Sequence, residues 1–156
     1  RFTDLDNITE RADIFLPTLR EYLSICKKYG KEAVLELKRD MERAHVEGIA
    51  AEVEDVGMFE STTFISFSKQ NLLYLRDAHP HTKAQYLTGD TGKENLEWML
   101  NNNMDADIYY ESLTKEFVDT MHKNGRVVNV WTVDTLEDAN RMLGLGVDMI
   151  TSNILE

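Results

Sequence analysis

Residues 127 to 133 read Val127-Val128-Asn129-Val130-Trp131-Thr132-Val133, and this stretch decides the fold class. A run that is apolar at almost every position is typical of a strand covered on both faces, as in a parallel sheet. A helix start signal follows at once, with Asp134 or Thr135 as the N-cap, and residues 136–143 have the apolar spacing of a helix. The stretch therefore predicts one strand-to-helix unit of a parallel α/β sheet.

The same unit recurs along the chain. Short β-prone runs alternate with helix-period segments, and these runs lie at residues 33–38, 63–67, 83–87, 106–110, 127–133 and 147–150. This alternation predicts βαβ units, here five or six strands each followed by a helix, and the count depends on residues 106–110. Periodicity leaves two architectures open, a sheet that curls towards a barrel and a doubly wound open sheet.

Capping residues mark the expected helix boundaries. Thr18 with Glu21, and Thr91 with Glu94, have the spacing of a capping box, in which each side chain satisfies a free backbone N–H of the first turn. Ser68 is a further N-cap candidate. Three glycines are placed where a left-handed residue would end a helix, namely Gly30, Gly125 and Gly144.

Composition limits the classes of function. The length of 156 residues, 42% of them apolar, predicts a single domain over residues 1–156. A net charge of −11 argues against sequence-independent nucleic-acid binding, because an acidic surface repels phosphate backbones. The single cysteine, Cys26, excludes an internal disulfide and favours a reducing compartment such as the cytoplasm without fixing the localisation. No apolar run approaches the roughly 18 residues of a transmembrane segment.

Polar residues at the carboxyl ends of the expected strands are the candidates for chemistry. Glu36 and Lys38 are two residues apart, so both side chains point to the same face, where they could hold a hard cation and a phosphate oxygen. They could equally form a solvated ion pair. Trp131 could wall a pocket or belong to the core, whereas Phe67 is expected in the core and Asp134 as a helix cap. The four histidines lie in or after helix-like segments, away from these strand ends.

Several segments together resemble the glycerophosphodiester phosphodiesterase family. Residues 16–23 resemble its Pro-Thr-Leu-x-Glu-x-Leu helix, residues 35–38 its Glu-x-Lys strand, and residues 64–67 its Ser-Phe strand. Residues 130–134 are similar to its Trp-Thr-Val-Asn/Asp segment, and residues 146–153 to its closing Gly-Val-Asp-x-Ile-Thr-(Thr/Ser)-Asn/Asp. Asn153 and Leu155 stand where many members have Asp and Pro.

This resemblance implies a TIM-like barrel that hydrolyses glycerophosphodiesters to an alcohol and glycerol 3-phosphate with Mg²⁺ or Ca²⁺. The family's catalytic pair is two histidines, from a His-Arg-Gly motif and a His-Asp motif on earlier strands. By resemblance, Glu36 is a metal ligand, Lys38 binds the phosphate, and Trp131 walls the pocket for the glycerol.

The sequence departs from the family in its first third. It contains no His-Arg-Gly, no His-Asp and no Glu-x-Asp before Glu36, so we expect no catalytic residue in this chain and no diesterase activity from it alone. Because such a barrel takes about 250 residues, the expected fold is a truncated one. A sheet with open edges would be completed by a homo-oligomer, by residues 1–15, or by the remainder of a larger parent chain, which the start at Arg1 favours.

Three hypotheses stay open at this point. The chain is part of an active diesterase; or it is a non-catalytic binding or assembly module that holds a glycerophosphodiester or glycerol-phosphate ligand; or it is a doubly wound protein that matches by coincidence. The third hypothesis predicts that Glu36 and Trp131 lie far apart.

Overall fold

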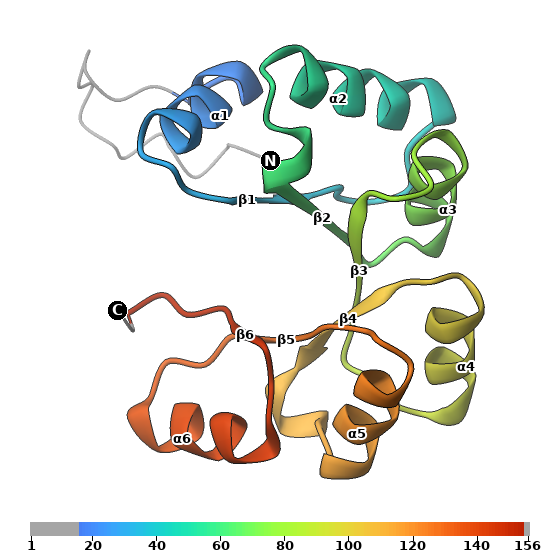
Figure 1. Ribbon diagram of the computed structural model, residues 1–156, viewed down its shortest axis with the longest axis vertical. Coiled ribbons are helices and arrows are strands. Elements are labelled where there is room, and N and C mark those ends of the chain that lie inside the picture. Colours follow the sequence, from blue (N-terminus) through green and yellow to red (C-terminus); the bar gives the residue numbers. More distant parts are fainter. Residues whose placement is uncertain (1–15, 155–156) are drawn as a thin grey trace, which may run out of the picture.

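The computed structural model describes residues 16–154. Within them, six parallel strands form one sheet in chain order, and Figure 1 shows that this sheet curls into half a barrel. The strands are β1 (Ala33–Glu36), β2 (Thr62–Ser66), β3 (Lys83–Thr88), β4 (Asp105–Tyr109), β5 (Val128–Trp131) and β6 (Met149–Ile150).

Helices alternate with the strands and cover the convex, outer side of the sheet (Figure 1). They are α1 (Leu19–Lys28), α2 (Arg43–Asp55), α3 (Lys69–Ala78), α4 (Lys93–Asn101), α5 (Lys115–Lys123) and α6 (Leu136–Leu145), with the short 3₁₀ helices η2 (Phe59–Ser61) and η3 (Tyr110–Ser112). The predicted partial barrel is confirmed, and residues 106–110 do contain a strand. A doubly wound sheet is excluded, because its strand order would reverse at a switch point.

The predicted caps hold at three helices. Thr18 and Glu21 form the capping box of α1, with the Thr18 N–H donating to Glu21 Oε2 over 2.8 Å. Ser68 caps α3 by accepting the Asn71 N–H. At α6 the cap is Thr135, the second of the two expected candidates. Capping chemistry is local, so short sequence patterns reveal it.

Two predicted helix boundaries are wrong. The N-cap of α4 is Gly92, and the hydroxyl of Thr91 instead donates to the carbonyl of Ser112 over 3.0 Å, so no capping box forms with Glu94. Gly144 lies inside α6, which ends at Gly146 with a left-handed φ of 88°. A tertiary hydrogen bond displaced the first boundary, and the second glycine of a pair took the left-handed conformation at the other.

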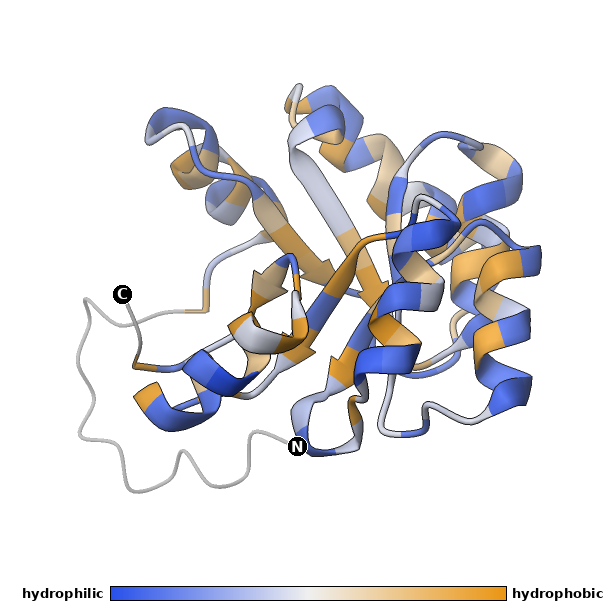
Figure 2. Cartoon of the chain, turned by 60° about the horizontal axis from the view of Figure 1, so that its bottom comes forward, coloured by the Kyte–Doolittle hydropathy of each residue, from blue (hydrophilic) through white to orange (hydrophobic). Residues whose placement is uncertain are grey.

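The hydrophobic core lies between the convex face of the sheet and the helices. Figure 2 shows the helices with hydrophobic and hydrophilic sides, as expected when one side packs on a sheet. Strand residues that alternate towards this side are fully buried, among them Phe64, Ile108 and Val130. The helices meet them with buried side chains such as Leu72 and Met121.

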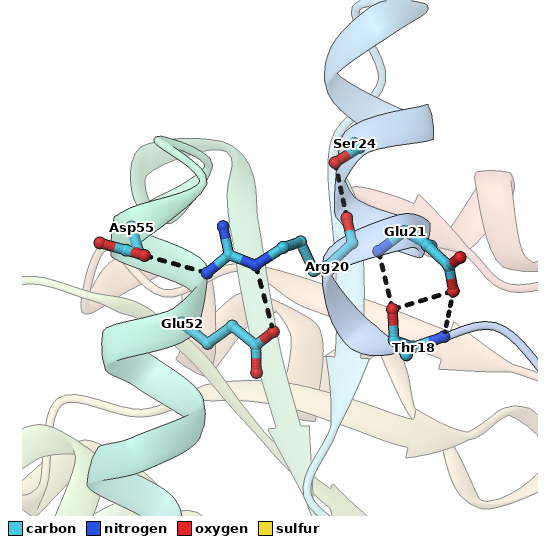
Figure 3. A network of polar contacts seen from close by, with 6 residues as sticks. All are labelled: Thr18, Arg20, Glu21, Ser24, Glu52 and Asp55. Carbon is cyan, nitrogen blue, oxygen red and sulfur yellow. Dashed lines mark hydrogen bonds and ion pairs between the residues drawn. The ribbon is translucent and has the colours of Figure 1, made fainter.

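A polar network ties α1 to α2 at the surface (Figure 3). The guanidinium of Arg20 lies 2.9 Å from the carboxylate of Asp55 and 3.7 Å from that of Glu52. Exposed ion pairs of this kind contribute at most about 1 kcal/mol each. Burial of Leu23 and Cys26 is therefore the larger contribution to holding α1 in place.

The sheet has two open edges within the described residues. Strands β1 and β6 each pair with a single neighbour, β2 and β5 respectively. Large exposed apolar side chains lie beside these edges, namely Ile25 on α1, Tyr29 just after it, and Leu136 and Leu143 on α6. The expected alternative that residues 1–15 close the sheet lies outside the described residues. None of the helices between residues 16 and 154 has the length and apolar character needed to cross a bilayer.

Candidate functional site

A cavity of about 450 Å³ lies on the concave face of the sheet, near the carboxyl ends of the strands. It brings together all three residues that the sequence singled out, although they come from distant parts of the chain. Its polar and aromatic lining includes Glu36, Lys38, Phe67, Asp107, Trp131 and Thr151. The hypothesis of a doubly wound protein predicted that Glu36 and Trp131 lie far apart, and it is therefore wrong.

Glu36 and Lys38 form an ion pair at the mouth of this cavity. The Lys38 ammonium lies 2.6 Å from Glu36 Oε2, and its side chain is 74% exposed. Because one carboxylate satisfies only part of the donor capacity of an ammonium, Lys38 keeps N–H donors for a second anion. A solvated pair of this kind is worth less than about 1 kcal/mol, so an incoming phosphate can compete with it.

Two buried side chains hold the loop that carries Lys38. Ser66, at the end of β2, donates its hydroxyl to the Leu37 carbonyl over 2.6 Å. Asn71 on α3 donates to the Arg39 carbonyl over 2.6 Å and accepts the Met41 N–H over 3.0 Å. Asn71 was not predicted as a site residue, because nothing in a helical pattern reveals a side chain that bonds a loop about thirty residues earlier.

Aromatic side chains form one wall of the cavity. The Trp131 indole N–H donates to the Asp107 carbonyl over 3.1 Å, and its ring is packed by Phe67 and Tyr109, with centroids 5.7 and 5.4 Å away. The expectation that Phe67 belongs to the core is wrong. Strand β2 ends at Ser66, and Phe67 lies just beyond it, 55% exposed at the cavity.

Asp107 is a second carboxyl group at the cavity, and the sequence analysis did not identify it. It lies on β4 with 1% of its surface exposed, and its Oδ1 has no hydrogen-bond partner. Burial, with a further contribution from the charge of Glu36, raises the pKa of Asp107 to about 7. The one available signal was an acidic residue at an interior position of a short strand.

Further buried polar side chains surround Asp107 on the concave face. Asn129 is paired with it in register on β5 and is also 1% exposed. The Asn129 amide donates to Gln85 Oε1 and Thr151 Oγ1, each over 3.4 Å, while Asn129 Oδ1 has no partner. Two unpaired oxygens therefore lie on neighbouring strands in this layer.

Asp134 is a structural residue of the loop after β5, and its predicted role as a helix cap is wrong. Its carboxylate accepts the backbone N–H and the side-chain amide of Asn153 over 2.8 and 2.9 Å, which lowers the pKa of Asp134. The contact joins the chain after β5 to the chain after β6. Thr135 is left to cap α6.

Comparison with known proteins identifies the family. A model of the glycerophosphoryl diester phosphodiesterase family matches residues 3–156. The chain belongs to this family. Solved structures of glycerophosphodiester phosphodiesterases are also similar to this chain, although their sequence identities to it are low. No curated protein sequence matches it.

Three solved structures illustrate the likeness. A protein from Galdieria sulphuraria described as a glycerophosphodiester phosphodiesterase is 27% identical with a TM-score of 0.83, over 96% of this chain and 65% of its own. One from Silicibacter pomeroyi is 28% identical with a TM-score of 0.77, over 87% and 52%. An Oleispira antarctica phosphodiesterase in complex with the product sn-glycerol-3-phosphate is 20% identical with a TM-score of 0.72, over 87% and 57%, and shows the fold alone. The chain thus spans about half to two thirds of their lengths.

The phosphodiesterase family generally uses a divalent metal, and the described residues do not by themselves make a site for one. No group of three or more His, Cys, Asp or Glu side chains between residues 16 and 154 is placed to hold a metal ion. Glu36 and Asp107 are the two carboxyl groups that line the cavity. His122 instead pairs with Asp148 over 2.9 Å, and His79 packs on Phe59.

Proposed function

We propose that the concave cavity of this phosphodiesterase-family domain binds glycerophosphodiesters and glycerol phosphates. The observation that carries the proposal is that Glu36, Lys38 and Trp131, which come from β1, the loop after it and β5, line one cavity. The strand ends of a parallel barrel are where such folds bind ligands. The size of the cavity, about 450 Å³, suits a small organic phosphate.

Each of the three residues has a distinct role in this proposal. The Lys38 ammonium binds a phosphoryl oxygen, using the donors that Glu36 leaves free. The Trp131 ring packs against the glycerol carbons. Glu36 would supply one carboxylate ligand to Mg²⁺ or Ca²⁺, and further ligands would be needed to complete the site.

We further propose that this chain alone binds its ligand without hydrolysing it. The family's two histidine motifs are absent from the sequence, and neither His79 nor His122 lines the cavity. A positioned acid or base contributes about 10²–10⁴-fold to such a reaction, so losing both leaves little turnover. Hydrolysis then requires the strands that carry those histidines. The alternative is that the domain has no part in hydrolysis and serves only as a non-catalytic binding or assembly module within a larger protein.

An assay of glycerol 3-phosphate release from glycerophosphocholine tests this proposal. We expect no turnover by the 156-residue chain with Mg²⁺ or Ca²⁺. Metal-dependent turnover that Glu36→Ala abolishes would contradict the proposed inactivity.

Ligand binding is tested separately by thermal unfolding with sn-glycerol 3-phosphate. The ligand should raise the unfolding temperature of the wild type, because a ligand that binds only the folded state stabilises it. Lys38→Met keeps most of the side-chain stem and removes the ammonium, so the shift should shrink. No shift in the wild type would contradict binding.

The open sheet edges support association with another polypeptide, either a second copy or the remainder of a larger chain. Exposed strand edges and apolar side chains such as Leu136 and Leu143 favour it. Sedimentation should therefore detect an oligomer of the isolated chain. A compact monomer with uncovered edges would contradict this part of the proposal.

A further inference from the structure

The buried carboxyl group of Asp107 has no hydrogen-bonding role within the described fold. Its Oδ1 is unpartnered although the residue is 1% exposed, and the side chain lies at the concave cavity. Trp131 contacts the Asp107 backbone carbonyl, so that hydrogen bond does not use the carboxylate. Burying a polar group without a partner costs about 1–3 kcal/mol, so this arrangement weakens the fold unless something binds there.

We propose that Asp107 recognises the hydroxyl groups of the polyol half of a phosphorylated ligand, which makes it a specificity-determining residue of the cavity. This inference rests on the proposed function. It adds a residue that the family resemblance did not supply.

The immediate surroundings of Asp107 favour hydroxyl groups over a cation. Asn129, its partner in register, has a second unpaired oxygen, while its amide is already bonded to Gln85 and Thr151. Two unpaired acceptors on neighbouring strands require donors, and a pair of adjacent hydroxyl groups supplies two. No three metal-ligating side chains among the described residues come together here.

The position of Asp107 also sets the direction in which a ligand would lie. Lys38 is at the end of the sheet that begins with β1, whereas Asp107 is on β4, three strands away. Trp131 is bonded to the Asp107 carbonyl and lines the same cavity. A ligand with its phosphate at Lys38 and its hydroxyl groups at Asp107 would span the cavity along the Trp131 ring. Glycerol 3-phosphate has both groups, and propyl phosphate lacks the hydroxyls.

Calorimetric titration of the 156-residue chain with sn-glycerol 3-phosphate and with propyl phosphate tests this inference. At pH 8, where Asp107 is ionised, the wild type should bind sn-glycerol 3-phosphate about tenfold more tightly than propyl phosphate, since hydrogen bonds to a charged group have roughly this strength. Asp107→Leu should abolish that preference, because it removes both acceptor oxygens. Asp107→Asn keeps one acceptor oxygen and the side-chain shape, so it should retain part of the preference, and it serves should the leucine variant not fold.

Asp105→Asn is the matched control. Asp105 lies on the same strand and is partly buried, but it accepts the Val127 N–H over 2.9 Å and does not line the cavity. This variant should keep the wild-type preference.

The outcomes separate the two proposals. Equal affinity of the wild type for both phosphates would overturn the role of Asp107 and leave the proposed function standing. The full wild-type preference in Asp107→Leu, or in Asp107→Asn should the leucine variant not fold, would do the same. Either result would mean that internal water molecules donate to Asp107 Oδ1 and Asn129 Oδ1. Failure of the wild type to bind either phosphate would overturn both proposals.

Discussion

The two faces of the curled sheet differ in the side chains that they bury. The convex face, under the helices, buries apolar side chains such as Phe64 and Val130. The concave face buries polar ones, Gln85, Asp107 and Asn129, at equally low exposure. Apolar burial stabilises a fold, whereas unpaired polar burial destabilises it. The comparison indicates that the convex face supplies the stability, and it supports the proposal that the concave face binds a ligand.

The largest effect should come from deleting an apolar side chain of the convex face. Phe64→Ala leaves a cavity under the helices and should lower the free energy of unfolding by about 3–5 kcal/mol. Its neighbour Ile65 lines the concave cavity and is only partly buried, so Ile65→Ala should cost about 1–2 kcal/mol. Urea unfolding measures both. Equal losses would remove the distinction between the faces.

The second largest effect should be a pH dependence of stability that comes from Asp107 on the concave face. Folding raises the pKa of Asp107 from 3.8 to about 7, so the folded state holds this proton more tightly than the unfolded state. Its ionisation therefore weakens the fold as pH rises from about 4 through 7, by up to about 4 kcal/mol. Asp107→Asn should be more stable than the wild type at pH 8 and equal to it at pH 4. Parallel stability curves for the two proteins between pH 4 and pH 8 would refute this.

Asn71 connects the two faces, because it lies on a covering helix and holds the loop of the cavity. Asn71→Ala leaves the Arg39 carbonyl and the Met41 N–H without their partner and should cost about 2 kcal/mol. It should also weaken binding of sn-glycerol 3-phosphate, because Lys38 lies on that loop. Asn102→Ala is the control, since the Asn102 amide bonds a carbonyl of its own helix. An unchanged affinity in Asn71→Ala would show that the loop needs no such support.

The smallest effect is expected at the outer surface. Thr18→Ala removes the capping box of α1 and should cost about 1 kcal/mol in thermal or urea unfolding. Because no residue of α1 lines the cavity, the affinity for sn-glycerol 3-phosphate should not change. A loss of affinity would mean that α1 contributes to the site.

The elements that sequence predicted well are those specified locally. Each expected β-prone run overlaps a strand, and Thr18 and Ser68 cap the helices they precede. Thr91 failed as a cap because its hydroxyl bonds Ser112, a residue brought close only by the fold. Boundaries that depend on tertiary contacts could not be read from short patterns.

The candidate site divides in the same way. Glu36, Lys38 and Trp131 belong to recognisable segments, so the resemblance found them. Asp107 and Asn129 gained their importance from burial and pairing across strands, which a single sequence does not display.

The most direct test of the central claim uses the two tryptophans of the chain as reporters, one for each face. Trp131 lines the concave cavity, and Trp98 on α4 packs against Tyr86 with ring centroids 5.1 Å apart. In a two-dimensional NMR titration with sn-glycerol 3-phosphate, the indole N–H resonance of Trp131 should shift and that of Trp98 should stay in place. A shift of Trp98 alone, or no shift of Trp131 at the highest ligand concentration, would contradict the assignment of the concave face as the binding site.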